Sequence, residues 1–99
     1  MIKEEIIGQV LQKKIDVLVC GILKIMLTPP QAIYLVGGYG RGEGAWYEGE
    51  EGLHPYNDFD LAVITDCPLP HEKTETLRKE LAIEVDIKWV DIDYYSLES

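Results

Sequence analysis

The beginning of the chain has the hydrophobic period of a helix. Between Ile2 and Leu27, apolar residues recur at intervals of three and four positions, as they do on one face of a helix. These apolar positions are Ile6, Ile7, Val10, Leu11, Ile15, Leu18, Ile22 and Ile25. Thr28-Pro29-Pro30 ends the pattern, because proline lacks the N–H group and disfavours helical geometry in the residue before it. We expect one helix here, or two with a break near Gly21.

Three later segments have the pattern of strands. Ala32–Val36 is a short apolar run, and Asp58–Ile64 alternates between polar and apolar residues before it becomes apolar. Ile83–Ile92 alternates along its length, which would place Asp86 on the polar face of a strand. His71–Leu81 precedes it as a charged segment whose leucines have helical spacing.

This order of elements predicts an α/β or α+β fold. We expect a small mixed sheet of about three to five strands, with helices packed on one face and acidic residues on the other. A length of 99 residues allows one domain, residues 1–99. Residues 45–57 are aromatic, acidic and glycine-containing without a clear period, which indicates a surface loop or a loose hairpin.

The net negative charge of the chain argues against polyanionic partners. Nine Lys and Arg residues against 18 Asp and Glu residues give a net charge of -9, which opposes binding to nucleic acid or to an anionic membrane surface. The longest apolar stretch, Ile15–Leu27, is too short to span a bilayer and carries charges. We therefore expect a cytoplasmic protein without a membrane span. Cys20 and Cys67 lack the close spacing of a metal site or redox pair, and we expect both to be reduced and buried.

Two acidic positions and a glycine-rich segment suggest chemistry. Asp58 and Asp60 would present two carboxylates on one face of a strand, where they repel each other unless a divalent cation lies between them. Asp86 could add a third carboxylate from a neighbouring strand, which would make a two-metal site. The segment Gly37–Gly44 holds five glycines in eight residues, and it follows a strand, where exposed backbone N–H groups can bind phosphate. Its spacing fits neither a dinucleotide fingerprint nor a Walker A loop.

These elements together resemble the nucleotidyltransferase superfamily that includes DNA polymerase β. Tyr34-Leu35-Val36-Gly37-Gly38 is similar to its apolar strand and glycine pair, and Asp58-Phe59-Asp60-Leu61 to its pair of metal-binding acids. Arg41 and Gly42 resemble the arginine and glycine found in small bacterial and archaeal members. Val85-Asp86-Ile87 looks like the third acid and its apolar neighbours. Nineteen residues separate Gly38 from Asp58, more than is usual in the family, so the chain resembles a version with an inserted loop.

The resemblance implies an enzyme that transfers a nucleoside monophosphate from a nucleoside triphosphate to a hydroxyl group of a protein or small molecule, with pyrophosphate leaving. Asp58, Asp60 and Asp86 would hold two Mg²⁺ ions and carry catalysis. Gly37, Gly38 and Arg41 would bind the nucleotide. The alternative that the resemblance leaves open is an antitoxin-like or regulatory domain that acts mainly by pairing with a helical partner. A protein partner or a homo-oligomer is compatible with either hypothesis, since a chain of this size buries a limited core.

Overall fold

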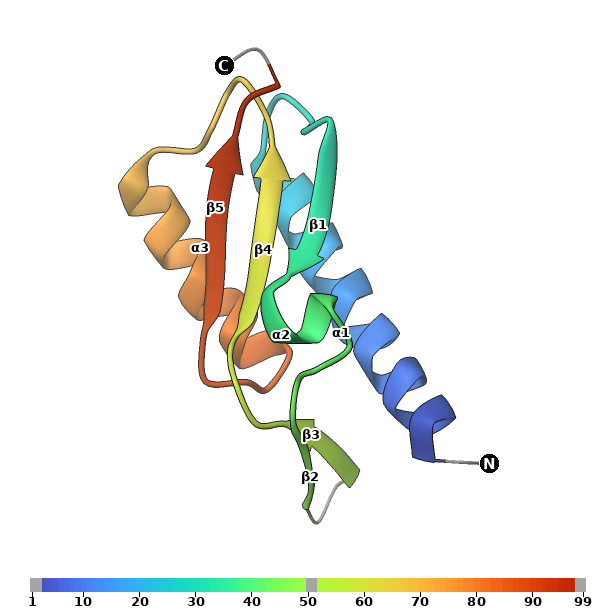
Figure 1. Ribbon diagram of the computed structural model, residues 1–99. Coiled ribbons are helices and arrows are strands. Elements are labelled where there is room, and N and C mark those ends of the chain that lie inside the picture. The colour runs from blue at the N-terminus through green and yellow to red at the C-terminus, as the bar shows by residue number, and fades with distance from the viewer. Residues whose placement is uncertain (1–2, 50–51, 98–99) are drawn as a thin grey trace.

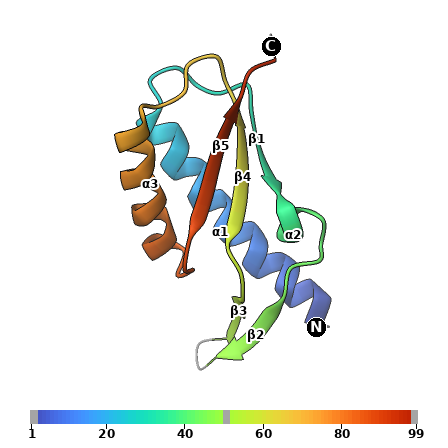
Figure 2. The same ribbon diagram turned by 60° about the vertical axis from the view of Figure 1, so that its left-hand side comes forward.

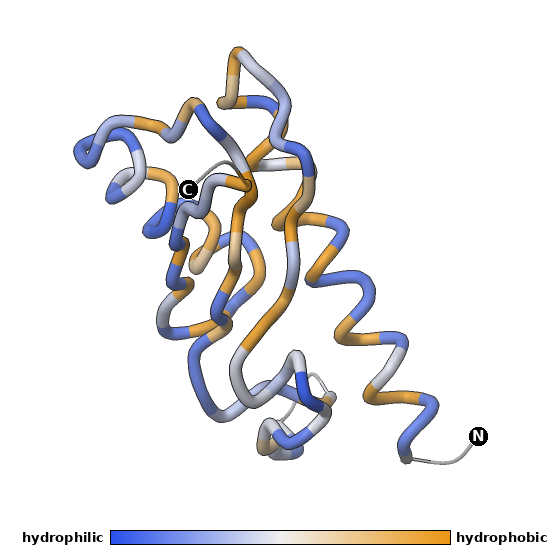
Figure 3. The backbone as a smooth tube through the Cα atoms, turned by 45° about the horizontal axis from the view of Figure 1, so that its top comes forward, coloured by the Kyte–Doolittle hydropathy of each residue, from blue (hydrophilic) through white to orange (hydrophobic). Residues whose placement is uncertain are grey.

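The helical pattern at the start of the chain forms one unbroken helix, α1 (Lys3–Ile25). A computed structural model describes residues 3–49 and 52–97, so Ile2, the expected first residue of this helix, lies outside the described residues. Figure 3 shows the alternation of hydrophobic and hydrophilic residues along α1. The alternative of a break near Gly21 is wrong. Gly21 is instead a crossing point, because a Cβ atom there would lie 2.5 Å from Cδ2 of Leu81 on another helix.

The main sheet has three strands in the order β1 (Ala32–Val36), β4 (Phe59–Ile64) and β5 (Val90–Tyr95). β1 and β4 are antiparallel, whereas β4 and β5 are parallel and are joined by the crossover helix α3 (His71–Glu84). Figures 1 and 2 show α1 and α3 on the same face of this sheet. The predicted α/β class and the mixed sheet with helices on one face are confirmed.

The two faces of the sheet differ in burial. One face packs against the helices and forms the core with them. The largest fully buried side chains come from α1, α3 and all-apolar positions of β4 and β5: Leu18, Ile22, Leu81, Phe59, Leu61, Val63 and Val90. The other face is open, and the strand register places three rows of residues on it. These rows are Val36, Asp60 and Asp91; Tyr34, Ala62 and Asp93; and Ala32, Ile64 and Tyr95.

The glycine-rich and aromatic segments form a small substructure beside the sheet. Directly after β1 the chain makes one turn of helix, α2 (Gly37–Gly40). The segment expected to be a loop or loose hairpin contains an antiparallel hairpin of β2 (Trp46–Gly49) and β3 (Gly52–Pro55). In Figure 1 the hairpin extends beyond the lower end of the main sheet.

The strand predicted over residues 83–92 is wrong in most of its length. Residues up to Glu84 belong to α3, Val85 follows the helix and is buried, and the strand begins only at Val90. The physical reason is that Val85 continues the stripe of Leu77 and Leu81 at a spacing of four, and this helical stripe packs into the core. Residues four positions apart, such as Leu81 and Val85, lie on one face of a strand as well as on one face of a helix, so the hydrophobic pattern of this short segment fits both.

Two further findings concern location and thiols. Within residues 3–49 and 52–97, no helix combines the length and the apolar character that a bilayer span requires. Cys20 and Cys67 are free, but both are exposed, so the expectation of burial is wrong. Cys20 lies on the side of α1 that faces a groove rather than the sheet.

Candidate active site

Asp60 and Asp91 stand side by side on the open face of the sheet. They are directly paired residues of the parallel strands β4 and β5, and Asp58 immediately precedes β4. Burial raises the pKa of the Asp60 carboxyl above its ordinary value of 3.8, and a hydrogen bond with Asp91 raises it further. The negative charges of Asp91, Asp58 and Asp93 act in the same direction. The fold therefore concentrates carboxylates that a cation or a shared proton must neutralise.

The backbone of the glycine segment lies directly against this acid pair. Gly37 has a φ of +71°, a left-handed conformation that glycine adopts readily. A Cβ atom at this position would lie 2.3 Å from Oδ2 of Asp60. Glycine at position 37 thus lets the main chain turn away from β1 while it stays in contact with the Asp60 carboxylate.

An open cleft of about 490 Å³ joins the acids to the glycine segment. We call it the acidic cleft, and its lining residues are Gly38, Tyr39, Glu43, Gly44, Tyr56, Asn57, Asp58, Asp60, Lys88 and Asp91. Lys88 is the one cationic side chain among these lining residues. A phosphate group in the cleft would therefore need Lys88, main-chain N–H groups or bound cations as partners.

Asp86 does not join this group. It lies in the turn after α3 with a φ of +56°, and its Oδ2 is 3.6 Å from Nδ1 of His54 on the hairpin. It lines grooves on other sides of the turn and is not among the residues of the acidic cleft. The prediction that Asp86 shares a strand face beside Asp58 and Asp60 is wrong, because residue 86 follows a helix instead of lying within a strand.

Asp91 occupies the place that the sequence interpretation assigned to Asp86. Val90-Asp91-Ile92 has the same apolar-acid-apolar pattern as Val85-Asp86-Ile87, so two residues of the sequence fit the pattern of the third acid. The two acids differ in secondary structure. Asp91 lies within β5 between the buried residues Val90 and Ile92, whereas Asp86 follows Val85 at the end of α3. The indole N–H of Trp89 donates a hydrogen bond of 2.8 Å to Oδ1 of Asp91 and holds that carboxylate in place.

The other predicted nucleotide-binding residues lie at different distances from the acids. Gly37 contacts Asp60, and Gly38 lines the acidic cleft. Arg41 does not line the cleft; its Nε donates to Glu43 at 3.1 Å, and both side chains are about two-thirds exposed. The prediction that Arg41 binds phosphate therefore has no support from its position.

Tyr39 fastens the hairpin to the site. Its hydroxyl donates to the carbonyl oxygen of Ala45 at 2.6 Å and accepts a hydrogen bond from the backbone N–H of Asn57 at 2.9 Å. Its buried ring packs edge-on against Phe59, with ring centroids 4.9 Å apart. Both ends of the hairpin are thus attached to one side chain of α2, next to Asp58.

The acid pair fits Mg²⁺ in its chemistry. In the part of the chain that the structure describes, no group of three or more His, Cys, Asp or Glu side chains is arranged to hold a metal ion. Mg²⁺ is usually bound through one or two carboxylates, with substrate phosphates and water as its other ligands. Asp60 and Asp91 provide such a pair of hard oxygen donors. Burial is the main cause of the raised pKa of Asp60, and the hydrogen bond with Asp91 and the neighbouring negative charges, which a bound cation would offset, raise it further.

The comparisons with known proteins assign no family. No family model matches the chain. No solved structure is significantly similar to its fold.

Proposed function

We propose that this protein is a Mg²⁺-dependent nucleotidyltransferase that transfers a nucleoside monophosphate from a nucleoside triphosphate to a hydroxyl group of a protein or small molecule. The observation that carries the proposal is the direct pairing of Asp60 with Asp91 on the open sheet face, with the backbone of Gly37 against Asp60. The resemblance in Tyr34–Gly38 and Asp58–Leu61, which contain Gly37 and Asp60, also supports it. Asp91 takes the place of Asp86 as the third acid.

Each residue of the acidic cleft has a defined task in this proposal. Asp60 and Asp91 would hold Mg²⁺, and the bound metal would neutralise charge on the phosphate oxygens. Asp58 lines the same cleft and adds to its negative charge. Lys88 and the backbone of Gly38 bind the triphosphate.

The transfer step needs one proton acceptor. The acceptor hydroxyl oxygen forms a bond to the α-phosphorus, the bond from that phosphorus to the bridging oxygen breaks, and pyrophosphate leaves with the electron pair. The Asp91 carboxylate, which the hydrogen bond from the Trp89 indole orients, takes the hydroxyl proton.

The binding of Mg·ATP tests the proposal and its choice of acid. Isothermal titration calorimetry should show binding to the wild-type protein, and Asp91→Asn should weaken it at least tenfold more than Asp86→Asn, because only Asp91 faces Asp60. Circular dichroism spectra of both variants control for folding. If the wild-type protein does not bind Mg·ATP at millimolar concentration, the proposal is wrong. If Asp86→Asn has the larger effect, the assignment of the third acid is wrong.

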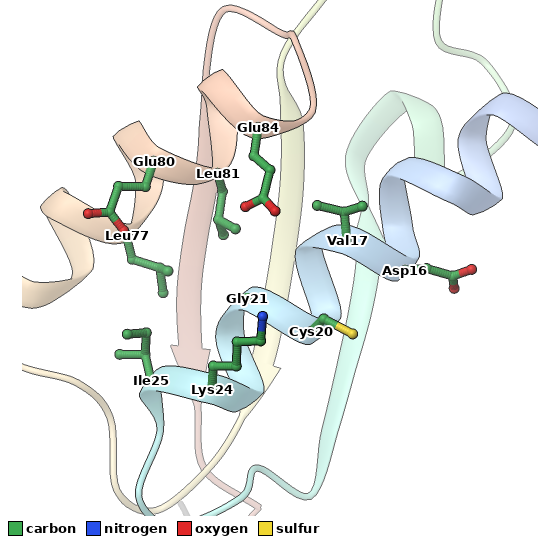
Figure 4. Close-up of a pocket in the computed structure, with 10 residues that line it drawn as sticks. All are labelled: Asp16, Val17, Cys20, Gly21, Lys24, Ile25, Leu77, Glu80, Leu81 and Glu84. Atoms are coloured by element: carbon green, nitrogen blue, oxygen red, sulfur yellow. The ribbon is translucent and has the colours of Figure 1, made fainter.

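A second candidate function is favoured by a groove between α1 and α3, on the opposite side of the molecule from the open sheet face. The groove has a volume of about 350 Å³, and its floor includes Val17 and Leu81. Figure 4 shows Glu80 and Glu84 of α3 along one side of it. The charged residues that line it are three acids and one base: Asp16, Glu80, Glu84 and Lys24. This excess of negative charge suits an amphipathic partner helix with basic residues beside its apolar face. This is the interaction-domain hypothesis.

Two synthetic peptides test this second candidate. They share one leucine-rich helical face and carry either lysine or glutamate at the flanking positions. Fluorescence anisotropy should show tighter binding of the lysine peptide, and Cys20→Trp, which puts a bulky side chain at a residue lining the groove, should weaken that binding. Equal binding of the two peptides, or binding that Cys20→Trp leaves unchanged, would contradict the candidate.

A further inference from the structure

A second groove continues from the acidic cleft along the hairpin. We call it the tyrosine groove; it has a volume of about 370 Å³ and is lined by Tyr47, Pro55, Tyr56, Asp86, Ile87 and Lys88. Tyr56 and Lys88 line both this groove and the acidic cleft. The two depressions are therefore direct neighbours, with Tyr56 and Lys88 between them.

Tyr56 is both exposed and held in place. The residue is 61% exposed, although its ring is large and mostly apolar. Its backbone N–H donates to the carbonyl oxygen of Ala45 at 2.9 Å, the same oxygen that accepts from Tyr39. The ring of Tyr47 packs edge-on against it, with ring centroids 5.1 Å apart.

Tyr47 in turn packs against a third ring, that of His54. Its ring stacks on His54 with centroids 5.4 Å apart and an interplanar angle of 28°. His54 in turn faces Asp86, so a row of aromatic rings connects Tyr56 to the turn after α3. An aromatic ring fixed in this way offers a flat surface to a ligand with little loss of side-chain entropy on binding.

We propose that Tyr56 is the platform on which the nucleobase of the triphosphate stacks, with Lys88 bound to its phosphates at the junction of the two depressions. The proposal rests on the proposed function, because it takes the position of the phosphates from the acid pair. It assigns the end of the hairpin segment a role in substrate binding: Tyr56, directly after β3, carries the base-binding ring, while the sheet carries the acids.

Inorganic triphosphate and ATP, each with Mg²⁺, separate the two parts of the ligand. Stacking of one base on an aromatic side chain contributes about 1–3 kcal/mol, which corresponds to an affinity difference of roughly 5- to 150-fold. Calorimetry should therefore show that the wild-type protein binds ATP at least fivefold more tightly than inorganic triphosphate. Tyr56→Ala should reduce the affinity for ATP to that for triphosphate, and Tyr56→Phe should keep the wild-type preference.

Two further variants complete the experiment. Lys88→Met should weaken the binding of both ligands by similar factors, since it contacts the phosphates. Tyr34→Ala is the matched control: Tyr34 is 57% exposed, but it lies on the open sheet face away from both grooves, so its loss should change neither affinity.

The outcomes distinguish the two proposals. If triphosphate binds but Tyr56→Ala leaves the affinity for ATP unchanged, the platform is refuted while the acidic cleft keeps its role. The same conclusion follows if the wild-type protein binds both ligands equally. If neither ligand binds to the wild-type protein, the proposed function and the platform are both refuted.

Discussion

Replacing Gly37 by alanine should destabilise the fold through two separable effects. The first is backbone strain, because Gly37 has a φ of +71°. The second is steric, because the new Cβ atom would lie 2.3 Å from Oδ2 and 3.2 Å from Cγ of Asp60. The carboxylate must therefore move away from its position beside Asp91.

The size of each effect follows from the geometry. A non-glycine residue in the left-handed region costs about 1–2 kcal/mol. Forcing the Asp60 side chain out of its rotamer costs a further ~0.5–1.5 kcal/mol. Gly42 separates these contributions, because it has a φ of +77° but no atom lies within 4 Å of the position that an added Cβ would take. Gly42→Ala should show the backbone effect alone.

Urea denaturation of a double-mutant cycle measures the steric part directly. Asp60→Ala removes the two closest atoms of the contact and leaves the Asp60 Cβ atom 3.4 Å away, an ordinary distance. In the Asp60→Ala background, Gly37→Ala should therefore cost no more than Gly42→Ala does. The reasoning is refuted if Gly37→Ala and Gly42→Ala destabilise the wild-type protein equally. It is also refuted if the excess effect of Gly37→Ala persists after Asp60→Ala, beyond the roughly 0.5 kcal/mol within which independent sites add.

Four other variants test the description of the fold and the site. Asp60→Asn should be more stable than the wild-type protein at pH 7 in a chelating buffer, and equally stable below pH 3.8. The reason is that the pKa of Asp60 is raised in the folded state, so wild-type stability falls as pH rises from 3.8 through the folded-state pKa. Urea denaturation at both pH values checks this. Tyr39→Phe should lower the unfolding free energy by about 1–3 kcal/mol, because its hydroxyl makes two partly buried hydrogen bonds. A loss under about 0.5 kcal/mol in urea denaturation would contradict the stabilising role of these two hydrogen bonds. Gly21→Ala should destabilise the protein by about 1–3 kcal/mol, because its Cβ would lie 2.5 Å from Leu81 in the core. Gly8→Ala, with no neighbour within 4 Å of the added Cβ, should stabilise it by about 0.5–1 kcal/mol; equal effects of the two glycine variants on the melting temperature would refute the helix crossing.

The elements with the strongest local signals could be predicted from the sequence. β1 has the expected bounds, 32–36, because an apolar run lies between prolines and glycines. β4 starts at Phe59, one residue after the expected start, and it places Asp60 on the face opposite the buried side chains of Phe59, Leu61 and Val63. The end of α1 follows from Pro29 and Pro30.

The third acid could not be predicted because it depends on long-range packing. Asp86 and Asp91 both lie between apolar residues, and the local pattern does not reveal which one is in a strand. Tertiary packing determines which acid lies in a strand, because Val85 packs into the core from the end of α3 whereas Val90 pairs with Phe59 in the sheet. Which residue of β5 pairs with Asp60 is fixed by this register, not by the sequence around either acid.

Likewise, no local pattern indicates that the glycine-rich segment touches Asp60. Positions 37–44 predict conformational freedom, but five glycines do not say which one needs it. The contact exists only because β1 and β4 are antiparallel neighbours, which places the last residue of β1, Val36, opposite Asp60. The resemblance indicated the order of the motifs, and the strand pairing determines their contacts.

The attachment of both hairpin ends to Tyr39 has a consequence for how this protein can diversify. The carbonyl oxygen of Ala45 and the N–H of Asn57 meet at one hydroxyl group, so the chain leaves the domain and re-enters it at nearly the same point. Segments joined in this way tolerate insertion, deletion and exchange, because the remaining backbone need not adjust. Exchange of the hairpin between Ala45 and Asn57 should therefore leave the positions of Asp60 and Asp91 on the sheet unchanged.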